Sequence, residues 1–180
     1  DQIVWLLGRS PRGMSVQALD AALHRGGSHL VTVRAEMARL RRVLGPGLLA
    51  SRPYRLTVLV ECDVAVVERR LKTGAVTGAA AAYTGPVLPG SQAPAVVRLR
   101  HRLTGGLRTA LLARRDPDLL ADWAHAPWGE DDVDIWRALA TVRPTAAVRA
   151  RLAALEAELA APADWTGSHG RPGAAPPQRG

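Results

Sequence analysis

The chain is poor in aromatic and thiol side chains. Among its 180 residues there is no phenylalanine, and Cys62 is the single cysteine. One cysteine excludes a disulfide framework and a cysteine-based zinc site within one chain, which suits a reducing cytoplasm. The acidic neighbours of Cys62, Glu61 and Asp63, would disfavour a thiolate, so we do not expect a nucleophile there.

The chain also lacks a long apolar run and the features of a signal peptide. No apolar segment approaches the roughly 18 residues that a membrane-spanning helix needs. We therefore expect a cytoplasmic, nucleoid-associated protein. Because the first residue is Asp1 rather than methionine, we also expect the chain to be part of a longer protein.

Motifs of known catalytic centres are missing as well. The sequence has no G-x-S-x-G and no Walker A loop, and its five histidines show no H-x-x-x-H or Cys/His spacing. The dense acidic group Glu130–Asp132 with Asp134 precedes an apolar-periodic segment, where carboxylates favour a helix N-terminus. We predict no enzyme, no cofactor and no metal site.

Positive charge is abundant and unevenly distributed. Lys72 is the single lysine among 24 basic residues, and this arginine excess is typical of a GC-rich genome, so arginine number alone is weak evidence. Residues 1–60, however, contain nine arginines against three acidic residues. A local positive field of this kind attracts phosphate backbones, although a solvated surface would look the same in sequence.

The segment Thr32–Leu44 carries the most informative pattern. At 100° per residue, its apolar residues form one stripe that should bury against a partner. The stripe consists of Val33, Met37, Leu40 and Leu44. The opposite face carries Ala35, Ala38, Arg39 and Arg42, with Arg34 and Arg41 flanking the stripe. That face is positive without being bulky, so it can lie close to a negatively charged partner.

The elements around this segment predict a winged helix-turn-helix. The chain begins with the end of a helix, and Ser15 is a good N-cap for a second one. Ser28 or Thr32 should cap the third helix, which Gly45–Gly47 should end. Residues 48–60 then read as two short strands around a tight loop at Arg52–Pro53.

The rest of the chain predicts short antiparallel helices. Pro94 should open a long helix that Gly105–Gly106 interrupts, and Asp116 and Asp131 or Asp132 should begin two more. The last helix, 145–160, should dock on the others. The predicted fold is mainly α, with a winged helix at 1–60, a helical domain at 61–161 and a disordered tail at 162–180.

Two motifs carry a resemblance to a known family. Residues Thr32–Gly45 and Arg52–Leu56 are similar to the third helix and wing of OmpR/PhoB-type winged-helix regulators, in which glycine is usual where Pro53 stands here. The segment 63–96 resembles the helical region of actinobacterial GAF-containing transcriptional regulators and, more loosely, the bacterial transcriptional activation domain. Together the resemblance covers about residues 1–143.

The resemblance implies roles for individual residues. It would place the third helix in the major groove, with Thr32, Arg34, Ala35 and Arg39 facing the groove and with Arg42 and Ser51 or Arg52 nearer phosphates; Arg52 could also enter the adjacent minor groove. Each arginine could instead be solvated or pair with Glu36, Arg39 and Arg41 could tie the helix to the domain, and Tyr54 is better placed in the core under the wing.

These observations favour sequence-specific binding of double-stranded DNA by the output part of a bacterial transcriptional regulator. RNA polymerase or an upstream sensor domain would be further partners, and a homodimer is an option. The alternative is a protein–protein interaction module whose winged helix no longer binds DNA. RNA binding is less expected, since base stacking needs exposed aromatic side chains.

Overall fold

The computed structural model describes residues 2–60 and 62–161, and this part of the chain is mainly helical. It contains nine α-helices and one two-stranded antiparallel sheet. In chain order the elements are α1 (Gln2–Gly8), α2 (Val16–Leu23), α3 (Leu30–Leu44), β1 (Leu49–Ala50), β2 (Arg55–Leu56), α4 (Asp63–Lys72), α5 (Val76–Ala82), α6 (Pro94–Arg114), α7 (Pro117–Ala124), α8 (Val133–Val142) and α9 (Ala146–Ala160). The predicted mainly α class is confirmed, and the predicted disordered tail lies outside the described residues.

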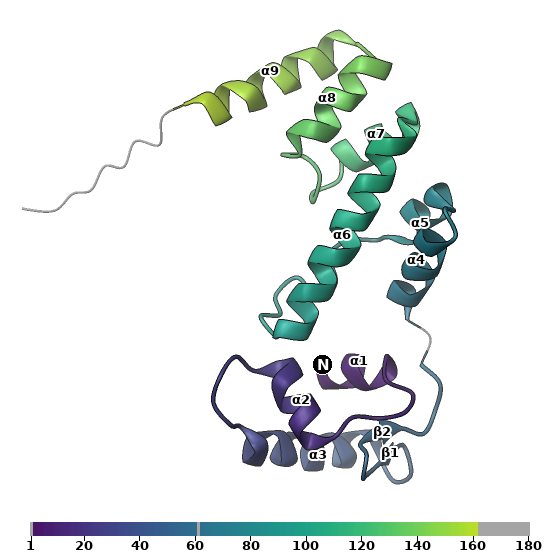
Figure 1. Cartoon of the computed structure of the whole chain (residues 1–180), viewed down its shortest axis with the longest axis vertical. Coiled ribbons are helices and arrows are strands. Elements are labelled where there is room, and N and C mark those ends of the chain that lie inside the picture. The colour runs from purple at the N-terminus through teal and green to yellow at the C-terminus, as the bar shows by residue number, and fades with distance from the viewer. Residues whose placement is uncertain (1, 61, 162–180) are drawn as a thin grey trace, which may run out of the picture.

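The elements gather at two ends of the long helix α6 (Figure 1). Helices α1–α3 and the sheet form one end, which we call the N-terminal unit (residues 2–60). Helices α4–α9 form the helical part (residues 62–161), in which α4 and α5 lie beside α6, α7 and α8 pack at its far end and α9 packs on α8. Each region has its own cluster of buried apolar side chains. The predicted domain boundary after residue 60 stays a prediction.

Helix α3 is anchored by the apolar stripe that its sequence predicts. Val33, Met37 and Leu40 are buried against side chains of α1, α2 and β1, and Leu44 packs at the edge of the same cluster. The partners of the stripe are Ile3, Leu7, Leu19 and Leu49. Burying each such side chain contributes about 1.5–3 kcal/mol, so one face of α3 is held firmly and the opposite face is left outside.

The short sheet is the predicted hairpin, and it is tied to the rest of the N-terminal unit. Leu49 pairs with Leu56 and Ala50 with Arg55. Met14 forms an isolated bridge with Tyr54, and the two backbone hydrogen bonds measure 2.8 and 2.9 Å. Gly13 (φ +83°) allows this approach, because a Cβ there would come within 2.7 Å of a ring carbon of Pro53. Tyr54 packs against the core cluster, as predicted.

Several helix starts follow the capping chemistry of the sequence. The Ser15 side chain accepts a hydrogen bond from the backbone of Ala18, and Asp116, Asp132 and Thr145 cap α7, α8 and α9 in the same way. Such a cap satisfies backbone N–H groups that the first helical turn leaves without a partner. The predicted caps Ser15 and Asp116 are confirmed, and Asp132 is the one of the two predicted starts that caps α8; the sequence placed Thr145 at the start of the last helix without predicting its capping role.

Helix α6 corrects one prediction. We expected an interruption at Gly105–Gly106, but the helix runs without a break from Pro94 to Arg114. Leu99, Leu103, Leu107 and Leu111 are buried along one side of it. Two glycines cost roughly 2 kcal/mol of helix propensity, and burial of these four leucines outweighs that cost.

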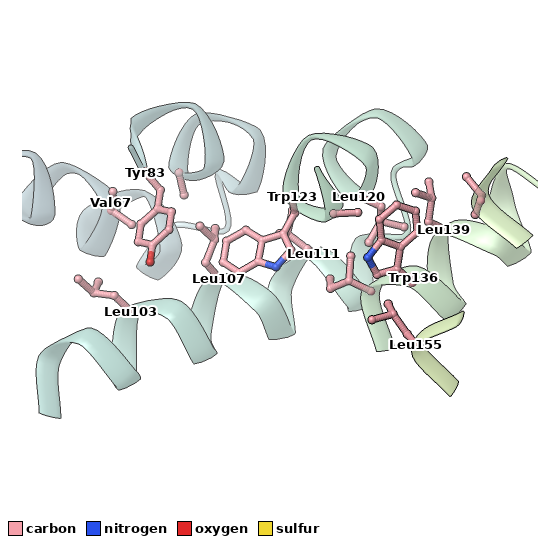
Figure 2. Close-up of a cluster of buried hydrophobic side chains, with 14 of the residues drawn as sticks. Val67, Tyr83, Leu103, Leu107, Leu111, Leu120, Trp123, Trp136, Leu139 and Leu155 are labelled. Carbon is pink, nitrogen blue, oxygen red and sulfur yellow. The ribbon is translucent and has the colours of Figure 1, made fainter. Parts of the chain in front are cut away.

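Aromatic rings complete the core of the helical part. Leu103, Leu107 and Leu111 of α6 point toward Tyr83 and Trp123 in Figure 2. The rings of Tyr83 and Trp123 stack with centroids 5.7 Å apart, and Trp128 meets both of them edge-on. Helix α9 docks on this core through Val148 and Leu155, as predicted.

A small charged cluster joins the two regions. The Glu68 carboxylate of α4 accepts a hydrogen bond from Arg9 and another from Arg102, each at 2.8 Å. Partial burial opposes ionisation of Glu68, but the hydrogen bonds from Arg9 and Arg102 outweigh it and lower the pKa of the carboxyl. Trp5 of α1 also packs against the core of the helical part.

Candidate nucleic-acid interface

The start of α3 differs from the prediction. The helix begins at Leu30, so neither Ser28 nor Thr32 caps it, and Thr32 lies inside its first turn. His29 occupies the N-cap position without a capping side chain. Instead, the backbone N–H of His29 donates to Oδ2 of Asp20 at 3.0 Å, so α2 fixes the point where α3 begins.

All seven residues predicted to contact DNA are exposed. They are Thr32, Arg34, Ala35, Arg39 and Arg42 of α3 and Ser51 and Arg52 of the hairpin. Figure 1 places α3 at the outer edge of the N-terminal unit, with the hairpin at its C-terminal end. Because the apolar stripe holds the opposite side of α3, the structure presents Ala35, Arg39 and Arg42 outward.

Arg39 has an acidic partner within α3. Its guanidinium lies 2.9 Å from the Glu36 carboxylate, one helical turn away, and both side chains are about half exposed. This is the pairing with Glu36 that the sequence left open. An exposed pair of this kind contributes only about 0–1 kcal/mol, so a phosphate could replace the carboxylate at little cost.

Arg41 links the helix to the hairpin. Its Nη2 donates to the Ser51 hydroxyl at 2.5 Å. This contact matches the structural role that we considered for Arg41, and it also occupies Ser51. The hydrogen bond fixes the position of the hairpin relative to the last turn of α3.

Three other predicted DNA-binding arginines lack an acidic partner among the described residues. Within the described residues, Arg34, Arg42 and Arg52 form no ion pair with a carboxylate. Arg52 stands at the hairpin tip with a left-handed backbone (φ +62°), which directs this corner of the chain outward. Their guanidinium groups are therefore available for a ligand outside the protein.

Thr32 lies on another side of α3 from Arg34. It lines a cavity of about 800 Å³ between α1, α3 and the loop 88–93, together with Val33 and Glu36. Of the four residues predicted to face the groove, Thr32 is thus the one nearest the helical part. The structure does not group it with Arg34.

The acidic group at 130–134 has structural partners. Asp132 caps α8 and receives two hydrogen bonds from Arg108, which also binds Asp134. Asp131 pairs with Arg151 at 2.9 Å. The interpretation of these carboxylates as helix N-terminal residues is confirmed for Asp132, and arginines from α6 and α9 neutralise the group.

The structure brings together three residues that the sequence analysis treated as scattered. Asp20, His24 and His29 meet where α2 turns into α3. Oδ1 of Asp20 lies 2.7 Å from Nδ1 of His24 and 3.5 Å from Nδ1 of His29. The spacing D-x3-H-x4-H was the available signal, but a glycine turn separates the two histidines, so helical periodicity did not reveal their proximity.

The carboxylate of this cluster is stabilised in its ionised form. The backbone N–H of His29 is the main cause of a lowered pKa for Asp20; burial opposes the effect, and His24 and His29 add to it. Asp20 is among the few buried polar residues of the described chain. A largely buried carboxylate therefore lies beside the Nδ1 atoms of two imidazole rings.

Comparison with known proteins gives two matches. Residues 116–161 match the family described as "YTH3-like protein, third C-terminal helical domain". This segment comprises α7, α8 and α9 together with the Asp116 cap. The C-terminal end of the helical part is thus similar to a helical domain that occurs in other proteins.

A protein of Rhodococcus erythropolis, described as an uncharacterized 47.3 kDa protein in the thcA 5' region, is 39% identical over 163 residues. The match covers 88% of this chain, and the chain spans 37% of the length of that protein. No solved structure matches. Neither description mentions DNA, a winged helix or a GAF domain, so the resemblance to such regulators stays a prediction.

The helices described between residues 2 and 161 are too short or too polar to span a membrane. This agrees with the absence of long apolar runs noted in the sequence.

Proposed function

We propose that the N-terminal unit binds double-stranded DNA in a sequence-specific manner as a winged helix, with α3 as the recognition helix and the hairpin as the wing. The observation that carries the proposal is the exposed surface of α3, where Arg34 beside the apolar stripe and Arg42 opposite it have no ion pair within the described residues. An α-helix fits the major groove, and an arginine there reads guanine with about 1–3 kcal/mol of discrimination.

Small side chains on the same face support the proposal. Ala35 and Ala38 lie between the arginines, so the backbone of α3 can approach base edges closely. At the end of α3 the hairpin tip carries Arg52, which could enter the adjacent minor groove or contact phosphate. The Arg41–Ser51 hydrogen bond would keep these two contacts in register.

The helical part would contact another protein. We infer that the chain is the output part of a bacterial transcriptional regulator of the GAF-associated kind, with RNA polymerase or an upstream sensor as the second partner. The support is the layout of the chain: an N-terminal unit with exposed arginines on α3 is followed by helices that share an apolar core, and ion pairs such as Arg108–Asp132 and Arg137–Glu156 hold some of these helices together.

Removal of individual arginines tests the proposal. Arg39→Ala and Arg52→Ala should each weaken binding to a selected duplex by about 1–3 kcal/mol, with little change in melting temperature. Arg149→Ala is the matched control, since this arginine is exposed on α9, far from α3. Fluorescence anisotropy at fixed salt measures the affinities, and unchanged affinity in both variants would falsify the groove assignment.

An interaction module without DNA binding is the second candidate. Val31 and Val43 are 78% and 72% exposed on α3, and apolar side chains suit a protein partner better than a phosphate backbone. The salt dependence separates the two functions. A DNA binder should lose affinity steeply as salt rises, by a slope of about 0.9 per neutralised phosphate, whereas a protein-docking fold should bind random duplex hardly at all.

A further inference from the structure

We propose that Asp20, His24 and His29 form a binding site for a divalent transition metal, with Zn²⁺ as the best-fitting ion. The site lies in the turn between α2 and α3. It is distinct from the proposed DNA-binding face and does not depend on it.

The backbone explains why the three side chains converge. Asp20 and His24 are four residues apart at the end of α2, so they project from the same side of the helix. Gly26 and Gly27 have φ values of +66° and +69°, a conformation that turns the chain back. His29 then reaches His24, and the two ring centroids lie 4.4 Å apart.

The donor atoms are close to the geometry that a metal requires. The nearest ligand atoms of the three residues all lie within 4.8 Å of one another. With metal–ligand bonds of about 2.0–2.1 Å, neighbouring donors of a tetrahedral site are about 3.3 Å apart. The 3.5 Å between Asp20 Oδ1 and His29 Nδ1 already fits, and the 2.7 Å contact with His24 needs to open by roughly half an ångström.

One atom of the cluster lacks a partner that a metal would supply. Nδ1 of His29 is buried, and among the described residues it has no hydrogen-bond partner. A buried polar atom in this state is unusual. Binding a metal would satisfy it and would use the oxygen Oδ1 of Asp20, while Oδ2 stays engaged by the backbone N–H of His29. Such outer hydrogen bonds orient ligands in known metal sites.

The ligand types select the class of ion. Two imidazole nitrogens and one carboxylate suit Zn²⁺, Cu²⁺, Ni²⁺ or Fe²⁺, whereas Mg²⁺ and Ca²⁺ require oxygen ligands. The rings of His24 and His29 are partly exposed, so water can complete a four-coordinate site. Because His29 immediately precedes α3, a bound ion would fix the start of that helix.

The test is titration of the untagged 180-residue chain with Zn²⁺ against a chromophoric chelator. We expect one tight site per chain, and His29→Gln should weaken it at least about tenfold, as expected for loss of a ligand from a three-ligand site. His101→Gln is the matched control, because His101 is exposed on α6. Co²⁺ loaded into the wild type should give visible d–d absorption that His29→Gln loses.

Folding of the variants is checked by their melting temperatures in EDTA. His29 is 42% exposed, so His29→Gln should melt close to the wild type without metal. His24→Gln provides a second test of the same site. The proposal is overturned if the wild type takes up no stoichiometric Zn²⁺ at micromolar concentration, or if uptake survives both substitutions.

Discussion

Two arginines of the helical part and two of α3 are in different surroundings. In the helical part Arg108 binds Asp132 and Asp134, and Arg137 bridges Asp134 and Glu156. On α3, Arg34 and Arg42 have no such partner in the described residues. The number of arginines therefore says little about function in this chain. The carboxylates beside Arg108 and Arg137 give these two a structural role, whereas the exposed position of Arg42 on the outer face of α3 makes it a candidate for ligand binding.

The net charges of the two regions differ as well. Residues 1–60 contain nine arginines and three acidic residues, while the remaining chain has nearly balanced charges. Where positive and negative charges are balanced, an arginine can form an ion pair with a carboxylate of a neighbouring helix. A surplus of positive charge leaves some guanidinium groups exposed to solvent. The two regions can therefore be tested separately.

The largest effect should come from the core of the helical part. Trp123 is 5% exposed and packs between Tyr83 and Trp128, so Trp123→Ala should destabilise this region by about 3–5 kcal/mol. Urea unfolding followed by circular dichroism measures the loss. Leu159→Ala is the control, because Leu159 is 70% exposed and its loss should change stability by less than about 0.5 kcal/mol. A loss below about 1 kcal/mol for Trp123→Ala would contradict the packing described for this core.

A matched pair of arginine substitutions tests the comparison directly. Arg108→Ala removes hydrogen bonds to Asp132 and Asp134 and leaves Asp132 partly buried without its partner, which should cost about 1–2 kcal/mol. Arg42→Ala should leave stability within about 0.5 kcal/mol and should instead weaken binding of duplex DNA. Equal losses of stability in both variants would show that Arg42 has a structural role after all.

The smallest effect concerns the junction between the two regions. Hydrogen bonds from Arg9 and Arg102 lower the pKa of Glu68 in the folded chain, in spite of partial burial. Its contribution to stability is therefore complete above the unfolded value of about 4.3, and it is lost as the pH falls through the folded-state pKa.

Glu68→Gln should accordingly flatten the decline of stability as the pH falls below the unfolded value of about 4.3, with a loss below about 1 kcal/mol at pH 7. Urea midpoints measured across this range check the expectation. Glu158→Gln is the control, since Glu158 is exposed near the end of α9. A steeper decline in Glu68→Gln than in the wild type would be the wrong sign for the mechanism.

Local signals predicted much of the fold. The stripe Val33, Met37 and Leu40 is buried as the helical period requires, and Ser15 and Asp116 cap helices because their oxygens face unpaired N–H groups. Such features depend on residues within one turn of one another. The hairpin was predicted for the same reason, from turn residues between two short apolar segments.

Features that depend on residues far apart were predicted less well. Gly105 and Gly106 weaken a helix locally, but packing of α6 on neighbouring helices keeps it continuous. The cluster of Asp20, His24 and His29 depends on a turn whose direction only the folded backbone gives. The exposure of the predicted site residues on α3 followed from the helical period. Whether Arg39 and Arg41 are solvated or have partners within the protein depends on side-chain positions, and the folded structure pairs Arg39 with Glu36 and Arg41 with Ser51.

Helix α6 determines how two partners could bind at once. Its 21 residues extend about 30 Å at 1.5 Å per residue, with α2 packed near its start and α7 at its far end. A ligand on the outer face of α3 and a protein on α7–α9 would thus be separated by roughly the diameter of a small domain. Deleting about four residues from α6 would shorten this spacing by about 6 Å and rotate one end against the other by about 40°. The length of α6, rather than any single contact, sets the spacing and the angle between the two surfaces.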